Sequence, residues 1–149
     1  MTDASTFAGE TTRFFHDKIP ITRAMGVAVE SYDAEKLIIT APLEPNHNHL
    51  GTAFGGSLSA ITTLAGYGLL WLELGDRDAH IVVKSSSIQY RHPVTGTIRA
   101  HCQRPAPETM DAFRKKFARS GKAGIELAVT IEEDGRSCVD FRGVFVALR

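Results

Sequence analysis

Apolar and polar residues alternate along much of the chain, which is the pattern of strands that bury one face. Between 123 and 132 the apolar residues recur at every second position, and the same period returns between 138 and 148. Four further stretches are rich in Val, Ile and Thr and are bounded by turn-forming residues, at 27–31, 36–42, 79–90 and 97–103. The pattern therefore predicts six strands.

One long segment breaks this alternation. The 21 residues from Thr52 to Leu72 include no Asp, Glu, Lys or Arg, and a membrane-spanning helix needs about 20 apolar residues. However, the segment contains four glycines, two serines and three threonines, and neither flank carries a cluster of Lys and Arg. We therefore expect a buried helix that runs to about Leu74 and stops at Gly75, and no membrane span.

The order of the predicted elements indicates the fold class. A short amphipathic helix around 5–17 ends at Pro20, and two strands, the long helix and four strands follow. A helix that is apolar on nearly every face has to be wrapped by other elements. We expect an α+β fold in which an antiparallel sheet of about six strands curls around one long central helix, as a single domain over 1–149. One sheet covers only one side of a helix, so we expect a second copy to cover the other, in a homodimer or a tetramer.

Composition narrows the class of protein. The chain has 17 basic and 17 acidic side chains and two cysteines, which argues against a disordered tail, a disulfide scaffold or a strongly basic nucleic-acid module. Cys102 and Cys138 fall on separate predicted strands without zinc-ligand spacing, so we expect two buried thiols, no metal and no cofactor. Residues 1–10 lack the apolar core of a signal peptide, which favours the cytoplasm.

The predicted central helix carries two features with chemical potential. Ser59, Thr63 and Gly66 recur at i, i+4 and i+7, so they either allow close packing or border a narrow channel, and both can hold at a subunit seam. Gly55 and Gly56 stand at the helix start, where free N–H groups and a partial positive charge can hold a carbonyl oxygen as it gains negative charge. A tight turn into a packed helix explains the glycine pair equally well.

Two motifs resemble a known family. The run Asn48-x-x-Gly51-x-x-Phe54-Gly55-Gly56 resembles the N-x-x-G-x-x-H-G-G signature of hotdog-fold acyl-CoA thioesterases of the phenylacetate-pathway type. The run Ser85-x-Ser87-x-x-Tyr90-x-x-Pro93 resembles the D-x-N-x-x-Y-x-x-P strand of the same family. Over residues 15 to 148 the chain looks closer still to the YiiD C-terminal type of thioesterase domain, which also occurs fused behind GNAT-type acetyltransferases.

The resemblance implies a hotdog fold and hydrolysis of an acyl-CoA or acyl-carrier-protein thioester in fatty acid metabolism. It assigns the N–H of Gly55 to the thioester carbonyl and Asn48 to the orientation of the carbonyl or of the attacking water. The family's carboxylate lies 15 residues after the asparagine, and here that position is Thr63, which could hold the water or act as a nucleophile beside a base. The residues that we expect to bind the substrate are Gly56 and Ser59 on the predicted helix, and Ser85 and Ser87 of the second motif.

Other side chains are candidates for a base or for charge recognition. His47 and His49 in the loop before the helix are candidate bases, although a metal pair or a solvated turn explains them too. His92 and His101 are expected in the sheet with satisfied hydrogen bonds. A basic segment either is a solvated face or meets coenzyme A phosphates or an acidic carrier protein, with nucleic acid less favoured; its residues are Arg114, Lys115, Lys116, Arg119 and Lys122.

Three functions follow from these observations. The first is a thioesterase that hydrolyses acyl-CoA or acyl-carrier-protein thioesters at the helix start. The second is a module that binds acyl thioesters without hydrolysing them and works with an acetyltransferase or in a fatty-acid pathway. The third is a hydratase or dehydratase, which needs a paired histidine and carboxylate that the predicted helix lacks.

Overall fold

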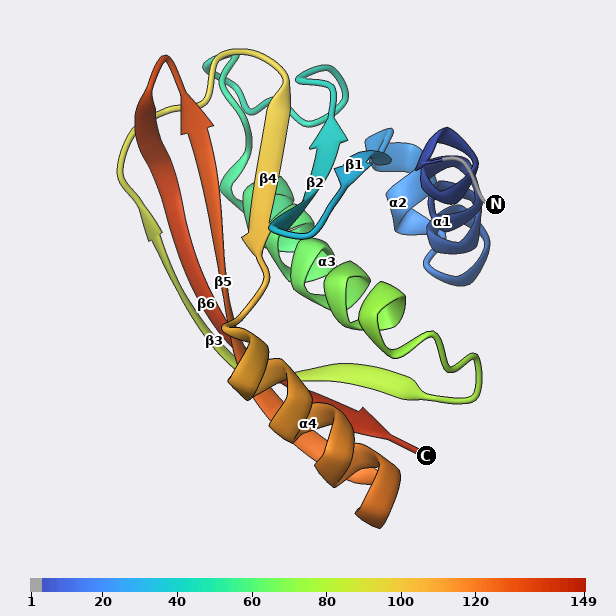
Figure 1. Ribbon diagram of the computed structural model, residues 1–149. Coiled ribbons are helices and arrows are strands. Elements are labelled where there is room, and N and C mark those ends of the chain that lie inside the picture. The colour runs from blue at the N-terminus through green and yellow to red at the C-terminus, as the bar shows by residue number, and fades with distance from the viewer. Residues whose placement is uncertain (1–3) are drawn as a thin grey trace.

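One antiparallel sheet of six strands dominates the protein, whose computed structural model describes residues 4–149 (Figure 1). The strand order across the sheet is β1-β2-β4-β5-β6-β3, and every neighbouring pair is antiparallel. The strands are β1 (Ala28–Tyr32), β2 (Lys36–Ala41), β3 (His80–Tyr90), β4 (Ile98–Gln103), β5 (Lys122–Glu133) and β6 (Arg136–Leu148). All six predicted strands are thus confirmed, with bounds that move by at most two residues.

The sheet curls around α3 (Gly55–Leu74), which is the predicted central helix (Figure 1). The helix begins after Phe54, whose backbone is extended, and ends at Gly75, whose φ of 61° is left-handed. Half of its residues are buried, among them Ile61, Leu64 and Leu69, because the helix packs against strands β2 to β6. The predicted fold class, a curled antiparallel sheet around one long helix, is confirmed.

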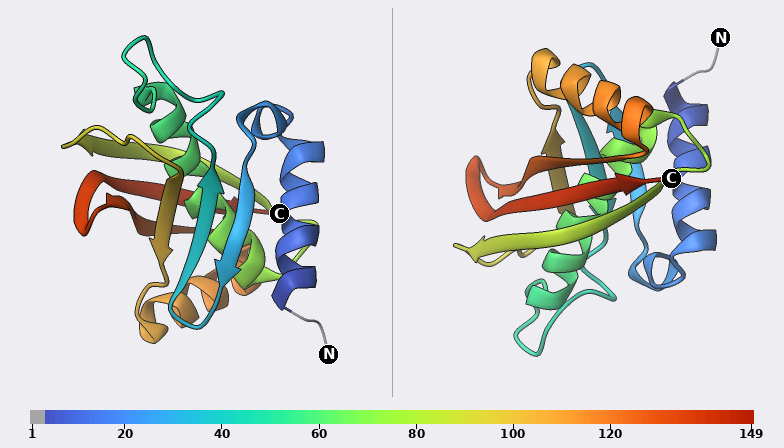
Figure 2. Two further views of the ribbon diagram at one scale, coloured as in Figure 1. Left: turned by 90° about the horizontal axis from the view of Figure 1, so that it is seen from above. Right: turned by 90° about the horizontal axis from the view of Figure 1, so that it is seen from below.

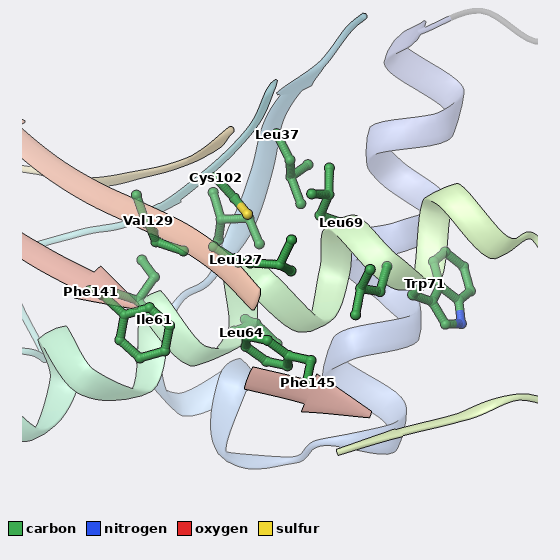
Figure 3. Packing of buried hydrophobic residues seen from close by; sticks show 14 of the residues in the cluster. Leu37, Ile61, Leu64, Leu69, Trp71, Cys102, Leu127, Val129, Phe141 and Phe145 are labelled. Carbon is green, nitrogen blue, oxygen red and sulfur yellow. The ribbon is translucent and has the colours of Figure 1, made fainter. Parts of the chain in front are cut away.

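The alternating residues of β5 and β6 form the other half of the core. Leu127 and Val129 of β5 and Phe141 and Phe145 of β6 are all buried and face α3 (Figure 3). Phe145 lies directly on Gly66 of α3, where a Cβ atom would come within 2.3 Å of the phenylalanine Cζ. Gly66 therefore serves close packing inside the chain and does not face a subunit seam.

Helix α1 (Ala4–Lys18) covers part of the side of α3 that the sheet leaves open. It stands beside β1 in both views of Figure 2. Phe14 stacks on Trp71 of α3 with ring centroids 4.4 Å apart, and Phe15 packs on Tyr67 and on the bare backbone of Gly68. The N-terminal helix therefore supplies part of the cover that was expected from a second copy.

Two helices were not in the predicted order of elements. The short α2 (Ile21–Met25) follows α1, and α4 (Pro107–Ser120) lies between β4 and β5. Helix α4 buries Met110, Phe113 and Phe117 against β5, at spacings of three and four residues that put them on one face. Pro107 in its first turn and the left-handed Gly121 after its last mark its ends in the sequence, so the signal for this helix was present.

A buried carboxylate anchors the far end of α3. The side chain of Glu73 is only 2% exposed, and it accepts a hydrogen bond from the Tyr32 hydroxyl at 2.6 Å. It also pairs with Arg104 Nε at 2.6 Å and with Arg114 of α4. Burial, and then the bond to Glu73, raises the pKa of Tyr32. This cluster ties α3 to β1 and α4 and neutralises charge that would otherwise be buried alone.

Two further sequence expectations concern the cysteines and the membrane. Cys102 and Cys138 are both fully buried, as predicted, and burial raises the pKa of the Cys102 thiol to about 12. No helix within residues 4–149 combines the length and the hydropathy that crossing a bilayer requires.

Candidate functional site

The loop that leads into α3 is organised by two asparagines. Asn46 is buried, and its Nδ2 donates to the carbonyl oxygens of Met25 and Pro42, each at 2.8 Å. Asn48 Oδ1 accepts from the backbone N–H groups of Leu50 and Thr52, at 2.8 and 3.2 Å, while its Nδ2 donates to Thr52 Oγ1 at 2.9 Å. These bonds occupy the Asn48 amide inside the loop. The sequence interpretation did not single out Asn46, although its place beside Asn48 in the motif was visible.

The start of α3 has no side-chain cap, so the first N–H groups of the helix have no partner there. The ring of Phe54 covers Gly56, where a Cβ atom would come within 2.4 Å of Phe54 Cε2. On the other side the Tyr90 ring lies against Gly55, and its hydroxyl donates to the Gly55 carbonyl at 3.4 Å. Two aromatic rings therefore flank a glycine pair whose backbone is open to a small ligand.

The start of α3 borders two separate hollows. The larger one, the α3 groove, has a volume of about 580 Å³ and runs along α3 from Gly56 to Tyr67. It is lined by α3 (Gly56, Ser59, Ala60, Thr63, Leu64, Tyr67), by the segment Lys18, Ile19, Ile21, Thr22 and Met25, and by Ile81, Val83 and Phe145. The smaller one, the β3-end hollow, has a volume of about 300 Å³ and is lined by Thr52, Ala53, Gly55, Leu58, Tyr90, Arg91, His92 and Pro93.

Thr63 lies in the α3 groove, and its hydroxyl is already engaged. Thr63 Oγ1 donates to the Ser59 carbonyl at 2.9 Å, so its proton points into its own helix. Eight residues separate it from Gly55, which is about 12 Å along the helix axis at 1.5 Å per residue. One protomer therefore does not bring Gly55 and Thr63 to a single thioester group.

The lining of the α3 groove is mainly apolar. Within residues 4–149, the titratable side chains that line it are Lys18 and Tyr67, and no carboxylate does so. Burial raises the pKa of Tyr67, so this phenol stays neutral across the physiological range. The groove is thus a surface for an apolar chain, without a base of its own.

The other residues predicted for substrate binding lie apart from the helix start. Ser85 and Ser87 are exposed on β3, which is at the edge of the sheet, and line neither hollow. Lys115, Lys116 and Arg119 are exposed on α4, whereas Arg114 pairs with Glu73. Since Glu73 is about 27 Å along the helix from Gly55, α4 meets the opposite end of α3.

The histidines considered as candidate bases or as sheet residues lie in three places: the loop before α3, the β3-end hollow and β4. His47 and His49 are exposed in the loop, where His47 Nδ1 lies 2.9 Å from the Asn48 carbonyl oxygen. His92 was expected in a strand, which is wrong: β3 ends at Tyr90, and His92 lies in the β3-end hollow together with Gly55. Sequence patterns did not place His92 beside Gly55 because 37 positions separate the two residues. His101 is on β4 as expected, and burial lowers its pKa. Within the described residues, no group of three metal-ligating side chains forms.

The chain is similar to a described family and to solved structures over nearly its whole length. Residues 9–149 match the family described as "Putative thioesterase (yiiD_Cterm)". A protein of unknown function from Chlorobaculum tepidum is 36% identical, with a TM-score of 0.90, over 98% of this chain and 96% of that one. A "putative thioesterase" from Shewanella oneidensis is 31% identical, with a TM-score of 0.82, over 95% of this chain and 97% of that one. A "probable thioesterase" from Pseudomonas aeruginosa has the same fold at 21% identity, with a TM-score of 0.78, over 94% of each chain.

Proposed function

This chain belongs to the YiiD C-terminal thioesterase family, and we propose that it hydrolyses an acyl thioester whose acyl chain lies in the α3 groove. The single observation that carries the proposal is the continuity of this groove with the start of α3, since Gly56 lines the groove and Gly55 precedes it. An acyl chain placed in the groove has its thioester at the helix start. The function is thus a thioester hydrolase that acts on acyl-CoA or on an acyl carrier protein.

The helix start supplies the stabilisation that the reaction needs. As the thioester carbonyl is attacked, its oxygen becomes negatively charged. The uncapped N–H of Gly55 and the partial positive charge of the helix N-terminus both favour that charge. In this proposal Asn48 acts on the reaction by holding the loop that positions Gly55, because its amide already bonds within the loop.

A second function is favoured by one specific observation, which is the lack of a carboxylate in the described lining of the α3 groove. A module that binds acyl thioesters and presents them to another enzyme needs the groove and the helix start but no base. The same fold would then hold an acyl group without releasing its thiol.

The exposed basic face of α4 suggests how the thiol carrier is recognised. Within the described part of the chain, Lys115, Lys116 and Arg119 form no ion pair, while Arg114 is neutralised by Glu73. We propose that this three-residue face, without Arg114, meets the phosphates of coenzyme A or the acidic surface of a carrier protein. Reversing the three charges should raise KM for the carrier that uses the face and leave KM for the other carrier unchanged.

The edge strand β3 supports a homodimer as part of the proposal. Its outer edge pairs with no other strand of residues 4–149, and Val82 and Val83 are 48% and 42% exposed. An exposed apolar edge invites pairing with another chain, and Val83 also lines the α3 groove. A second copy at β3 would therefore close the groove. Sedimentation equilibrium of the wild type and of Val83→Asp tests this: the substitution should shift the protein toward monomer.

Thiol release from short, medium and long acyl-CoA and acyl-carrier-protein substrates tests the proposed function directly. We expect release from at least one series. Ala60→Phe should reduce turnover of the preferred acyl length because the new ring fills the α3 groove, which Ala60 lines. Ala34→Phe places the same ring in the exposed turn between β1 and β2, away from the α3 groove, and is the matched control.

The possible results separate the candidates. Release that is lowered by Ala60→Phe and unchanged by Ala34→Phe supports a thioesterase that uses the α3 groove. Binding without release, measured by calorimetry on the same substrates, replaces the hydrolase with the binding module. If the protein neither binds any of these substrates nor releases thiol from them, both the hydrolase and the binding module are contradicted.

A further inference from the structure

Hydrolysis of a thioester by water requires a group that takes the proton of the water, and the α3 groove has none that does so near neutral pH. We propose that His92 is this general base and that it acts from the β3-end hollow, which also borders the helix start. The inference rests on the proposed hydrolase function. It adds a catalytic residue at a position that the second sequence motif leaves unspecified.

His92 and Gly55 share the lining of the β3-end hollow. The hollow has room for water and for the carbonyl end of a thioester, with a volume of about 300 Å³. The His92 side chain is exposed, and no hydrogen bond to its ring forms within residues 4–149, so both ring nitrogens are free to bind water. A general base needs this access, at hydrogen-bond distance from the water that it activates.

The backbone holds His92 in this place. The N–H groups of Arg91 and His92 both donate to the Cys138 carbonyl of β6, at 2.7 and 3.2 Å. Two residues further on, the Val94 carbonyl accepts from the Ala53 N–H at 2.8 Å, directly before α3 begins. The segment that carries His92 is thus bonded to the sheet on one side and to the entry of α3 on the other. These bonds fix the position of His92 relative to Gly55.

No other side chain of the hollow serves as the base. Tyr90 donates its hydroxyl proton to the Gly55 carbonyl, and a guanidinium such as that of Arg91 does not release a proton in proteins. Arg91 also pairs with Asp140 of β6, and this pairing lowers the pKa of that carboxyl. Asp140 is therefore committed to Arg91 and does not line the hollow.

Several charged and titratable groups lie near the segment that carries His92. Tyr90 and Arg91 are on this segment, Cys138 and Asp140 are on β6, and Glu133, Asp134 and Arg136 act on the Cys138 thiol. The first turn of α3 has no acidic residue and, in its sequence Gly-Gly-Ser-Leu, no basic one.

In the proposed reaction, water adds to the thioester carbonyl carbon and the thiol leaves. A His92 ring nitrogen accepts a proton from water while the water oxygen forms a bond to the thioester carbonyl carbon, and the carbonyl oxygen becomes an oxyanion beside the Gly55 N–H. The oxyanion then collapses, the C–S bond breaks, and the leaving thiolate takes the proton from the imidazolium. The products are the thiol and the carboxylic acid, which releases its own proton to solvent.

Replacing His92 by Ala tests the proposal in the full chain. We expect kcat to fall by about 10²- to 10⁴-fold, the range for loss of a general base, with KM nearly unchanged. In the wild type the rate should fall as the pH drops, because protonation removes a general base, and this acid limb should be lost in His92→Ala. Added imidazole should restore part of the rate because the hollow is open to solvent. His80→Ala, an exposed histidine at the start of β3, is the matched control and should behave as the wild type does.

Each result decides one point. If the wild type releases thiol while His92→Ala keeps its rate and its acid limb, the role of His92 is overturned and the hydrolase function stands. If the wild type releases no thiol from any substrate, the hydrolase function itself fails. Should His92→Ala not fold, as judged by its thermal transition, His92→Gln provides the same test with a side chain of similar size that cannot take the proton.

Discussion

The hydroxyl of Thr63 donates a hydrogen bond to the carbonyl oxygen of Ser59, 2.9 Å away and one turn earlier in α3. This bond directs the hydroxyl proton into the helix and leaves only oxygen lone pairs toward the α3 groove. A threonine in this state neither takes a proton from water nor attacks a thioester without a base beside it. Thr63, at the position where the family motif has a carboxylate, therefore forms part of the wall of the groove.

Thr63→Val should change catalysis little, because valine has nearly the same shape and the lost hydroxyl bonds only its own helix. We expect kcat to change by much less than the roughly 10²-fold that accompanies loss of a general base. Steady-state kinetics on the preferred thioester measures this. A large fall in kcat with an unchanged KM would instead show that Thr63 acts directly on the reacting thioester.

Asn48→Ala should lower stability and activity together. The substitution removes four hydrogen bonds that shape the loop before α3, and the free energy of unfolding should fall by about 1–3 kcal/mol. Urea unfolding and kcat/KM measured on the same preparation check this. Asn48→Asp keeps the acceptor oxygen for the two backbone N–H groups and should recover most of the stability. A rate loss in Asn48→Ala at unchanged stability would show that Asn48 acts directly on the substrate.

Gly66→Ala should destabilise the fold despite the better helix propensity of alanine. The new methyl group would meet Phe145 at 2.3 Å, and such overpacking typically costs about 1–3 kcal/mol. Gly9→Ala in α1 is the matched control, because its methyl group meets only Arg13 Nη1 at 3.6 Å, and it should be neutral or stabilising. Adding Phe145→Leu to Gly66→Ala should remove part of the penalty in a double-mutant cycle. Purely additive effects would contradict this contact.

Tyr32 should make stability depend on pH in the alkaline range. Burial and the bond to Glu73 raise the folded-state pKa of Tyr32 above the unfolded value of about 10. The stabilisation is therefore fully present below about pH 10 and is lost as pH rises through and above that value, because only the unfolded state ionises there. Wild type should be more stable than Tyr32→Phe at neutral pH, and the difference should narrow above about pH 10. A difference that stays constant on alkaline titration would contradict the bond to Glu73.

Local patterns account for most of the fold. The six strands follow from period-two alternation, and α3 follows from an uncharged run that ends at Gly75. The sequence pattern did not predict α4, although Met110, Phe113 and Phe117 have helical spacing, because charged side chains surround this short apolar stripe. The cover that α1 provides for α3 was missed for a different reason, since the stacking of Phe14 on Trp71 joins segments that no local pattern connects.

By itself, the sequence determined the central helix and the glycine pair that opens it, because a run without charge can be buried whole and glycine leaves the backbone open. Tertiary structure alone decided which side chains meet there. The return of the chain after β3 and the bond between Ala53 and Val94 bring His92 to the hollow of Gly55, while pairing with Glu73 takes Arg114 out of the exposed basic face. The physical reason is that contacts between distant residues depend on strand register and packing around the core, which no local spacing records.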